Sequence, residues 1–84
     1  MPNDAELLHR YAAEKAGDAF AEFVRRHIDF VFATALRQMG GDAHHASDVA
    51  QCVFTTAARK AESLAQYRTV KGWLYTTTRN ASAN

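Results

Sequence analysis

The sequence predicts an all-α fold, a compact bundle of three to four helices. Apolar residues recur at steps of three and four over long segments, whereas no segment alternates with period two for long enough to form a strand. The helix breakers are few, with Pro only at position 2 and Gly only at 17, 40, 41 and 72. With 84 residues and 48% hydrophobic content, we expect one small domain over residues 1–84.

The first helix is expected to begin at Asn3 or Asp4, with Glu6 placed to complete a capping box. Its apolar stripe is Leu7, Leu8, Tyr11 and Ala12. Gly17 and Asp18 are expected to end this helix, with Asp18 capping the next one.

The second helix, about 18–39, has the clearest periodicity. Its inward residues are Phe20, Phe23, Val24, His27, Ile28, Val31, Phe32, Ala35, Leu36 and Met39. Its outward residues are Arg25, Arg26, Asp29 and Arg37. Gly40 and Gly41 are expected to stop it.

Asp42 is expected to cap a third helix, about 43–61. Its buried residues should be Ala46, Val49, Ala50, Val53, Phe54 and Ala57. A loop should follow over 62–69, and Thr69 should cap a fourth helix, about 70–82, which Gly72 weakens. The inner face of the fourth helix should be Val70, Trp73, Leu74, Thr77 and Ala81.

Charge is distributed unevenly along the chain. Residues 1–58 hold five Lys/Arg against eight Asp/Glu, a net −3, whereas residues 59–84 hold five Lys/Arg against Glu62 alone, a net +4. Split polarity of this kind suggests two partners, one of them polyanionic. The alternative is that the basic side chains at this end of the chain only face solvent and bind no partner.

The basic end also carries aromatic rings and short polar side chains, as a single-stranded nucleic-acid site would. Tyr67 and Tyr75 could stack on exposed bases, and Asn80 could read base edges or bridge the backbone. The candidate phosphate ligands are Arg68, Lys71 and Arg79. Alternatively the tyrosines pack at the rim of the core, and Asn80 bonds its own backbone.

Three further segments are notable for their order and spacing. They are Ala19-Phe20-Ala21-Glu22-Phe23-Val24-Arg25-Arg26-His27, Ala46-Ser47-Asp48-Val49-Ala50-Gln51-Cys52-Val53-Phe54, and Trp73-Leu74-Tyr75 with Arg79-Asn80. Together they resemble region two of bacterial sigma factors, specifically the extracytoplasmic-function class. The resemblance covers nearly the whole chain.

The resemblance implies two partners and no cofactor. Asp48, Gln51 and Cys52 would face the clamp helices of the largest subunit of RNA polymerase core. Residues 62–69 and the start of the fourth helix would open and hold the minus-ten promoter element, while Arg79 and Asn80 would touch the non-template strand and adjacent duplex. An anti-sigma factor is a further partner that the family suggests.

The sequence departs from this family in three places. Cys52 stands where an acidic residue is usual, and the loop before Trp73 is shorter than expected. The chain also ends at Asn84, so we expect the second, helix-turn-helix domain to be missing. A helical protein–protein module without a DNA role, such as an anti-sigma-binding fragment, remains the alternative function.

Other function classes find little support in the sequence. We expect no enzyme, because no phosphate loop, catalytic triad or marked carboxylate pair occurs. His44, Asp48 and Cys52 share one helix face, but without a fourth ligand they predict no metal site. The single cysteine and the absence of a signal peptide at the N-terminus favour a cytoplasmic protein.

Overall fold

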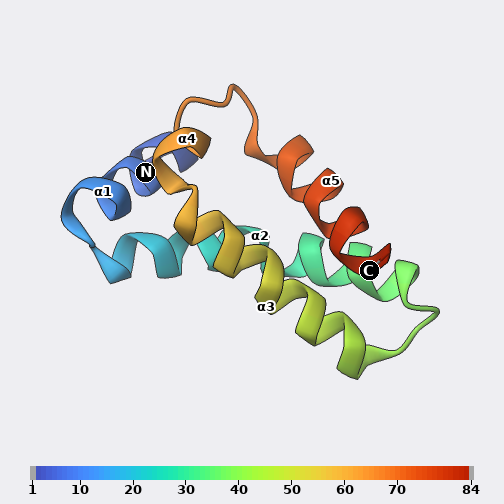
Figure 1. Cartoon of the computed structure of the whole chain (residues 1–84). Coiled ribbons are helices and arrows are strands. Elements are labelled where there is room, and N and C mark those ends of the chain that lie inside the picture. Colours follow the sequence, from blue (N-terminus) through green and yellow to red (C-terminus); the bar gives the residue numbers. More distant parts are fainter. Residues whose placement is uncertain (1, 84) are drawn as a thin grey trace.

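The computed structural model describes residues 2–83 of the chain, and this part contains five helices. They are α1 (Asp4–Glu14), α2 (Gly17–Gln38), α3 (Ala43–Arg59), α4 (Ala61–Leu64) and α5 (Val70–Ala83). The long helices α2 and α3 pack against each other, and α5 contacts both (Figure 1). Along the N-terminal half of α2, α1 packs on α2 and also on the single-turn α4. The all-α bundle expected from the sequence is therefore confirmed.

Side-chain caps fix the starts of α1 and α3 as expected. Asn3 Oδ1 accepts a hydrogen bond from Glu6 N at 2.8 Å, and Asn3 N donates to Glu6 Oε1 at 3.3 Å, which completes the capping box. Asp42 Oδ1 accepts from His45 N at 3.1 Å. Each bond satisfies a backbone N–H that has no partner within the first helical turn.

The boundary between α1 and α2 differs from the prediction. Lys15 adopts a left-handed conformation (φ 54°, ψ 36°) and donates its N–H to Tyr11 O at 2.9 Å, so α1 ends before Gly17. Helix α2 begins at Gly17, and its N-cap residue Ala16 makes no side-chain hydrogen bond. The prediction that Asp18 caps α2 is wrong. Asp18 lies in the first turn, where its charge favours the positive end of the helix dipole.

The segment expected to be a loop over 62–69 begins with helix α4. Helix α3 ends at Arg59, two residues earlier than predicted, and Leu64 N then donates to Lys60 O at 2.9 Å to close a new turn. Ala61 and Leu64 are both buried, so this turn presents one apolar side to the core. The physical reason is their spacing of three, which places two apolar residues on the same helical face.

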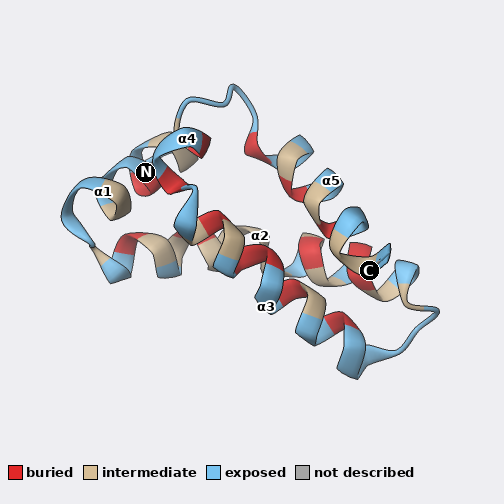
Figure 2. Ribbon diagram, viewed as in Figure 1, coloured by how far each residue is buried: buried red, intermediate tan, exposed pale blue. Residues whose placement is uncertain are grey.

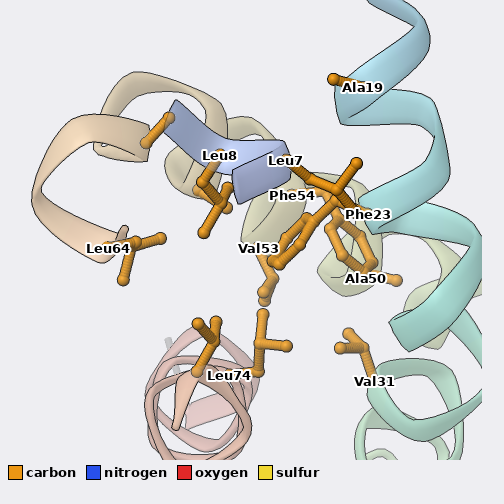
Figure 3. Close-up of a cluster of buried hydrophobic side chains, with 13 residues drawn as sticks. Leu7, Leu8, Ala19, Phe23, Val31, Ala50, Val53, Phe54, Leu64 and Leu74 are labelled. Carbon is orange, nitrogen blue, oxygen red and sulfur yellow. The ribbon is translucent and has the colours of Figure 1, made fainter. Parts of the chain in front are cut away.

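The core draws buried side chains from all five helices (Figures 2 and 3). Leu7 of α1 lies beside Phe23 of α2, and Leu8, Leu64 of α4 and Leu74 of α5 belong to the same core. Every inward residue predicted for the third helix is buried except the half-buried Val49. Across residues 2–83, none of the helices combines the length and the apolarity needed to cross a bilayer.

The prediction of the inner face of α5 missed one residue. Thr78, not Thr77, is fully buried, and Thr77 is only half-buried. Thr78 lies four residues after Leu74 and donates its hydroxyl to Leu74 O at 2.6 Å. Its polar atom therefore has a partner inside its own helix, so its burial leaves no hydrogen bond unmade.

Candidate nucleic-acid interface

The predicted DNA-contacting side chains all lie on the outside of the molecule. They are Tyr67, Arg68, Lys71, Tyr75, Arg79 and Asn80. Tyr67 is 46% exposed and Tyr75 is 40% exposed, although large aromatic side chains usually bury most of their surface. The segment between α4 and α5 is exposed (Figure 2), and together with the outer side of α5 it carries these basic and aromatic side chains.

Tyr67, Arg68 and Lys71 line one hollow of about 380 Å³. The other side of this hollow is formed by Asp4 at the start of α1 and by His27 of α2. The hollow therefore brings together groups from three elements that are far apart in the sequence. It offers a ring, two cations and a carboxylate within one concave site.

Asp4 is held in place by two partners on α2. Its Oδ2 lies 2.7 Å from His27 Nε2, and its Oδ1 lies 3.5 Å from Arg26 Nη1. Arg26 Nε in turn lies 3.3 Å from Glu22 Oε2. Hydrogen bonds from Arg25 and then Arg26 hold the pKa of the Glu22 carboxyl below its ordinary value. This network fixes the wall of the hollow and joins α1 to α2.

The prediction that Arg26 faces solvent is wrong, because its side chain is only 22% exposed. The reason is the carboxylate of Asp4, which α1 brings over this side of α2. His27, expected on the inner stripe, is only 13% exposed in its side chain and also contacts the Phe23 ring at 4.9 Å between centroids.

A second cluster follows the outer side of α5. Lys71, Tyr75 and Arg79 recur at four-residue steps, which places them on one helical face. Arg79 Cζ lies 5.8 Å from the Tyr75 ring centroid. Tyr75, Arg79 and Asn80 also line a small hollow of about 190 Å³. Lys71 borders the first hollow and belongs to this row, so it connects the two clusters.

Phe30 of α2 lies beside this row, although it was not among the residues predicted from the sequence. Lys71 Nζ lies 4.7 Å from the Phe30 ring centroid, and the Tyr75 and Phe30 centroids are 6.5 Å apart. The sequence did indicate that Phe30 points to a different side of α2 from the core stripe. Phe30 directly precedes Val31 and Phe32, and three consecutive helical residues cannot all face the same side.

Other members of the basic end lie apart from these clusters. Trp73 is half-buried and packs against the core, in agreement with its expected role. Arg59 and Lys60 are exposed at the end of α3 and line a separate hollow with Glu62. The basic end is therefore divided between two places rather than being one continuous patch.

The residues predicted to face RNA polymerase lie on α3. Asp48, Gln51 and the free thiol of Cys52 are all exposed. Gln51 also lines an open groove of about 680 Å³, whose apolar walls include Ile28 and Phe32 of α2. The groove is formed by α1, α2 and α3, so it lies on a different side of α2 from Phe30 and α5.

A family model for sigma-70 region 2 matches residues 23–84, about three quarters of the chain. The chain belongs to the sigma-70 region 2 family. No curated protein and no solved structure gives a significant match. Sigma region 2 is a transcription-factor domain, not an enzyme, and it takes part in binding RNA polymerase core and in recognising promoter DNA.

The matched region contains α3, α4 and α5 and most of α2, but not α1. Two of the three motifs seen in the sequence, those around Asp48 and Trp73, lie wholly inside it. Helix α1 lies outside it, although Leu7 and Leu8 belong to the same core and Asp4 lines the first hollow. In this sigma region 2 chain, α1 is structurally part of the unit that carries the candidate interface.

Proposed function

We propose that the outer side of α5 and the segment before it form a strand-capture surface, which binds the unpaired minus-ten promoter strand. We define this surface by Tyr67, Arg68, Lys71, Tyr75, Arg79 and Asn80. The observation that carries the proposal is the exposure of two tyrosine rings beside cations in a sigma region 2 domain. Catalysis in transcription then belongs to the polymerase.

The separation of the promoter DNA strands explains why this surface needs both aromatic rings and cations. A base that leaves the duplex loses its stacking, and an aromatic side chain restores about 1–3 kcal/mol per base. Tyr67 and Tyr75 supply that replacement. Arg68, Lys71 and Arg79 contact phosphates and release counterions. Asn80, with a donor and an acceptor in its side chain, contacts the strand or the adjacent duplex.

We further propose that the exposed side of α3 docks on the clamp helices of the polymerase, as in the extracytoplasmic-function class of sigma factors. Asp48 and Gln51 are three residues apart and exposed, so both can meet one partner helix. Asp48 suits a basic partner residue. Cys52 extends this side without adding charge.

The second candidate function is a helical interaction module that binds an anti-sigma factor and has no role in DNA binding. The observation that favours it is the open groove between α2 and α3, where Phe20, Val24 and Phe32 are only half-buried. Apolar surface in a concave site suits a protein partner better than a polyanion. The two candidate functions differ in whether the protein binds DNA through the strand-capture surface.

The deciding experiment is a salt titration of binding to a labelled, mixed-sequence single-stranded DNA. Arg68→Ala/Lys71→Ala/Arg79→Ala should weaken binding and flatten its salt dependence. The slope of log affinity against log salt should fall by up to about 2, since each single-strand phosphate contact contributes roughly 0.7.

The matched control is Arg10→Ala/Arg37→Ala/Arg59→Ala, which removes three exposed cations from α1, α2 and α3 and gives the same change in net charge. This control should retain the slope of the unmodified chain. Equal losses in both variants would show that only net charge matters. No loss in the first variant would support the interaction module.

A further inference from the structure

We propose that Phe30 of α2 is a positioning residue of the strand-capture surface. Its ring holds the Lys71 ammonium and the Tyr75 ring next to each other, so that one nucleotide can meet a cation and an aromatic face together. This inference rests on the proposed function, and it extends the nucleic-acid site from α5 to a second helix.

The contacts around Phe30 support this role. Lys71 Nζ lies 4.7 Å from the Phe30 centroid, within the range of about 6 Å in which a ring attracts a cation. The Tyr75 ring lies 6.5 Å away at an interplanar angle of 39°, inside the usual spacing of aromatic pairs. Both partners belong to α5, and they are one helical turn apart.

Phe30 differs from the other half-buried phenylalanines of α2. Phe20 and Phe32 line the groove between α2 and α3, whereas Phe30 faces α5. Phe23 is fully buried in the core, so it cannot contact a ligand. Phe30 alone among these four is in contact with members of the strand-capture surface.

Holding Lys71 in advance favours strand binding for an entropic reason. A free lysine side chain occupies many rotamers, and immobilising it when the ligand binds is unfavourable. With its ammonium over the Phe30 ring, Lys71 already occupies a restricted region and keeps N–H donors for a phosphate. Tyr75 stays 40% exposed, so ring surface remains available to a base.

The test compares Phe30→Leu with Phe32→Leu, the same change on the other side of the same helix. Phe30→Leu should weaken binding of the mixed-sequence single-stranded DNA by roughly two- to tenfold, the range expected when one more rotamer-rich side chain must be immobilised on binding. Phe32→Leu should leave that affinity unchanged, while both variants lower the unfolding midpoint similarly.

A double-mutant cycle separates positioning from general support of the fold. In a Lys71→Ala background the effect of Phe30→Leu should shrink, because the group that Phe30 holds is gone. Phe30→Trp should bind at least as tightly as the unmodified chain, because Trp attracts cations best. The Trp variant keeps the test valid even if Phe30→Leu does not fold.

Equal DNA-binding losses in the two Leu variants, or an undiminished effect of Phe30→Leu in the Lys71→Ala background, would overturn the inference. If the Arg68/Lys71/Arg79 triple variant loses binding but Phe30→Leu does not, only the role of Phe30 fails. If the triple variant keeps full binding, the strand-capture surface itself fails, and the role of Phe30 fails with it.

Discussion

At the scale of single residues, short polar side chains decide where helices start. Asn3, Glu6 and Asp42 are visible as caps in the sequence, and the structure confirms their bonds. Asp18 satisfied the same sequence rule but does not cap, because Lys15 ends α1 early and α2 begins one residue before Asp18. A cap therefore requires both the residue type and a backbone that turns at that residue.

The cap at Asp42 predicts a pH dependence of stability. The His45 backbone N–H donates to the Asp42 carboxylate, and this holds the pKa of that carboxyl below its ordinary value. Because folding lowers the pKa, the cap stabilises the fold above the unfolded-state pKa and is lost as pH falls through the folded-state pKa, below about pH 4.

Asp42→Asn should therefore match the unmodified chain near neutral pH, since Asn caps as well as Asp does. It should lose less stability on acidification, because its side chain does not titrate. Urea unfolding midpoints near neutral pH and below about pH 4 check this. Parallel losses in both proteins would contradict the assignment of acid sensitivity to this cap.

At the scale of helices, apolar periodicity predicted the long elements and missed the short one. The stripe of α2 and the buried residues of α3 follow from spacings of three and four. Helix α4 was missed because a four-residue turn contains only one repeat of the pattern. Its formation depends on the packing of Ala61 and Leu64 under α1, which only the tertiary structure shows.

A glycine in the first turn lowers the stability of helix α5. Gly72 is exposed, has no positive φ, and a Cβ added there would meet nothing within 4 Å. Gly72→Ala should stabilise the domain by about 0.4–1 kcal/mol and raise its midpoint of thermal unfolding by a few degrees. The measurement is circular dichroism during heating.

Gly41 provides the contrasting control, because a Cβ added there would also meet nothing within 4 Å, yet its φ is +88°. Gly41→Ala should destabilise the domain, since an alanine rarely adopts that conformation. If both substitutions had the same effect, backbone conformation would not be the deciding factor at these two positions.

At the scale of the whole molecule, α5 and the exposed side of α3 are two separate candidate binding surfaces. The strand-capture surface holds cations and rings, whereas Asp48 and Gln51 lie on α3. Apolar periodicity predicted the helices, the basic and aromatic residues indicated the nucleic-acid surface, and the family resemblance indicated the polymerase-facing residues. None of these assigned Phe30 or Asp4 to the site. The sequence indicated only that Phe30 departs from the inner stripe, and the contacts of both residues depend on how α2 meets α5 and how α1 meets α2.

The two surfaces should be separable by mutation. Asp48→Arg/Gln51→Ala should reduce retention of RNA polymerase core by the immobilised domain, since it reverses a charge on the proposed docking side. Asp29→Arg, a charge reversal at an exposed position of α2, is the matched control and should retain the polymerase. Full retention of core by the Asp48/Gln51 variant would remove the docking assignment.

The position of α1 has a consequence for any shortened version of this protein. A polypeptide starting at residue 23, where the family match begins, would lack Leu7 and Leu8 and would uncover α4, which rests on α1. The connection that leads from α4 to Tyr67 and Arg68 would then lose the packing of α4 on α1 that supports it. A fragment chosen from the family match alone would thus keep every residue of the proposed strand-capture surface but lose part of the structure that supports it.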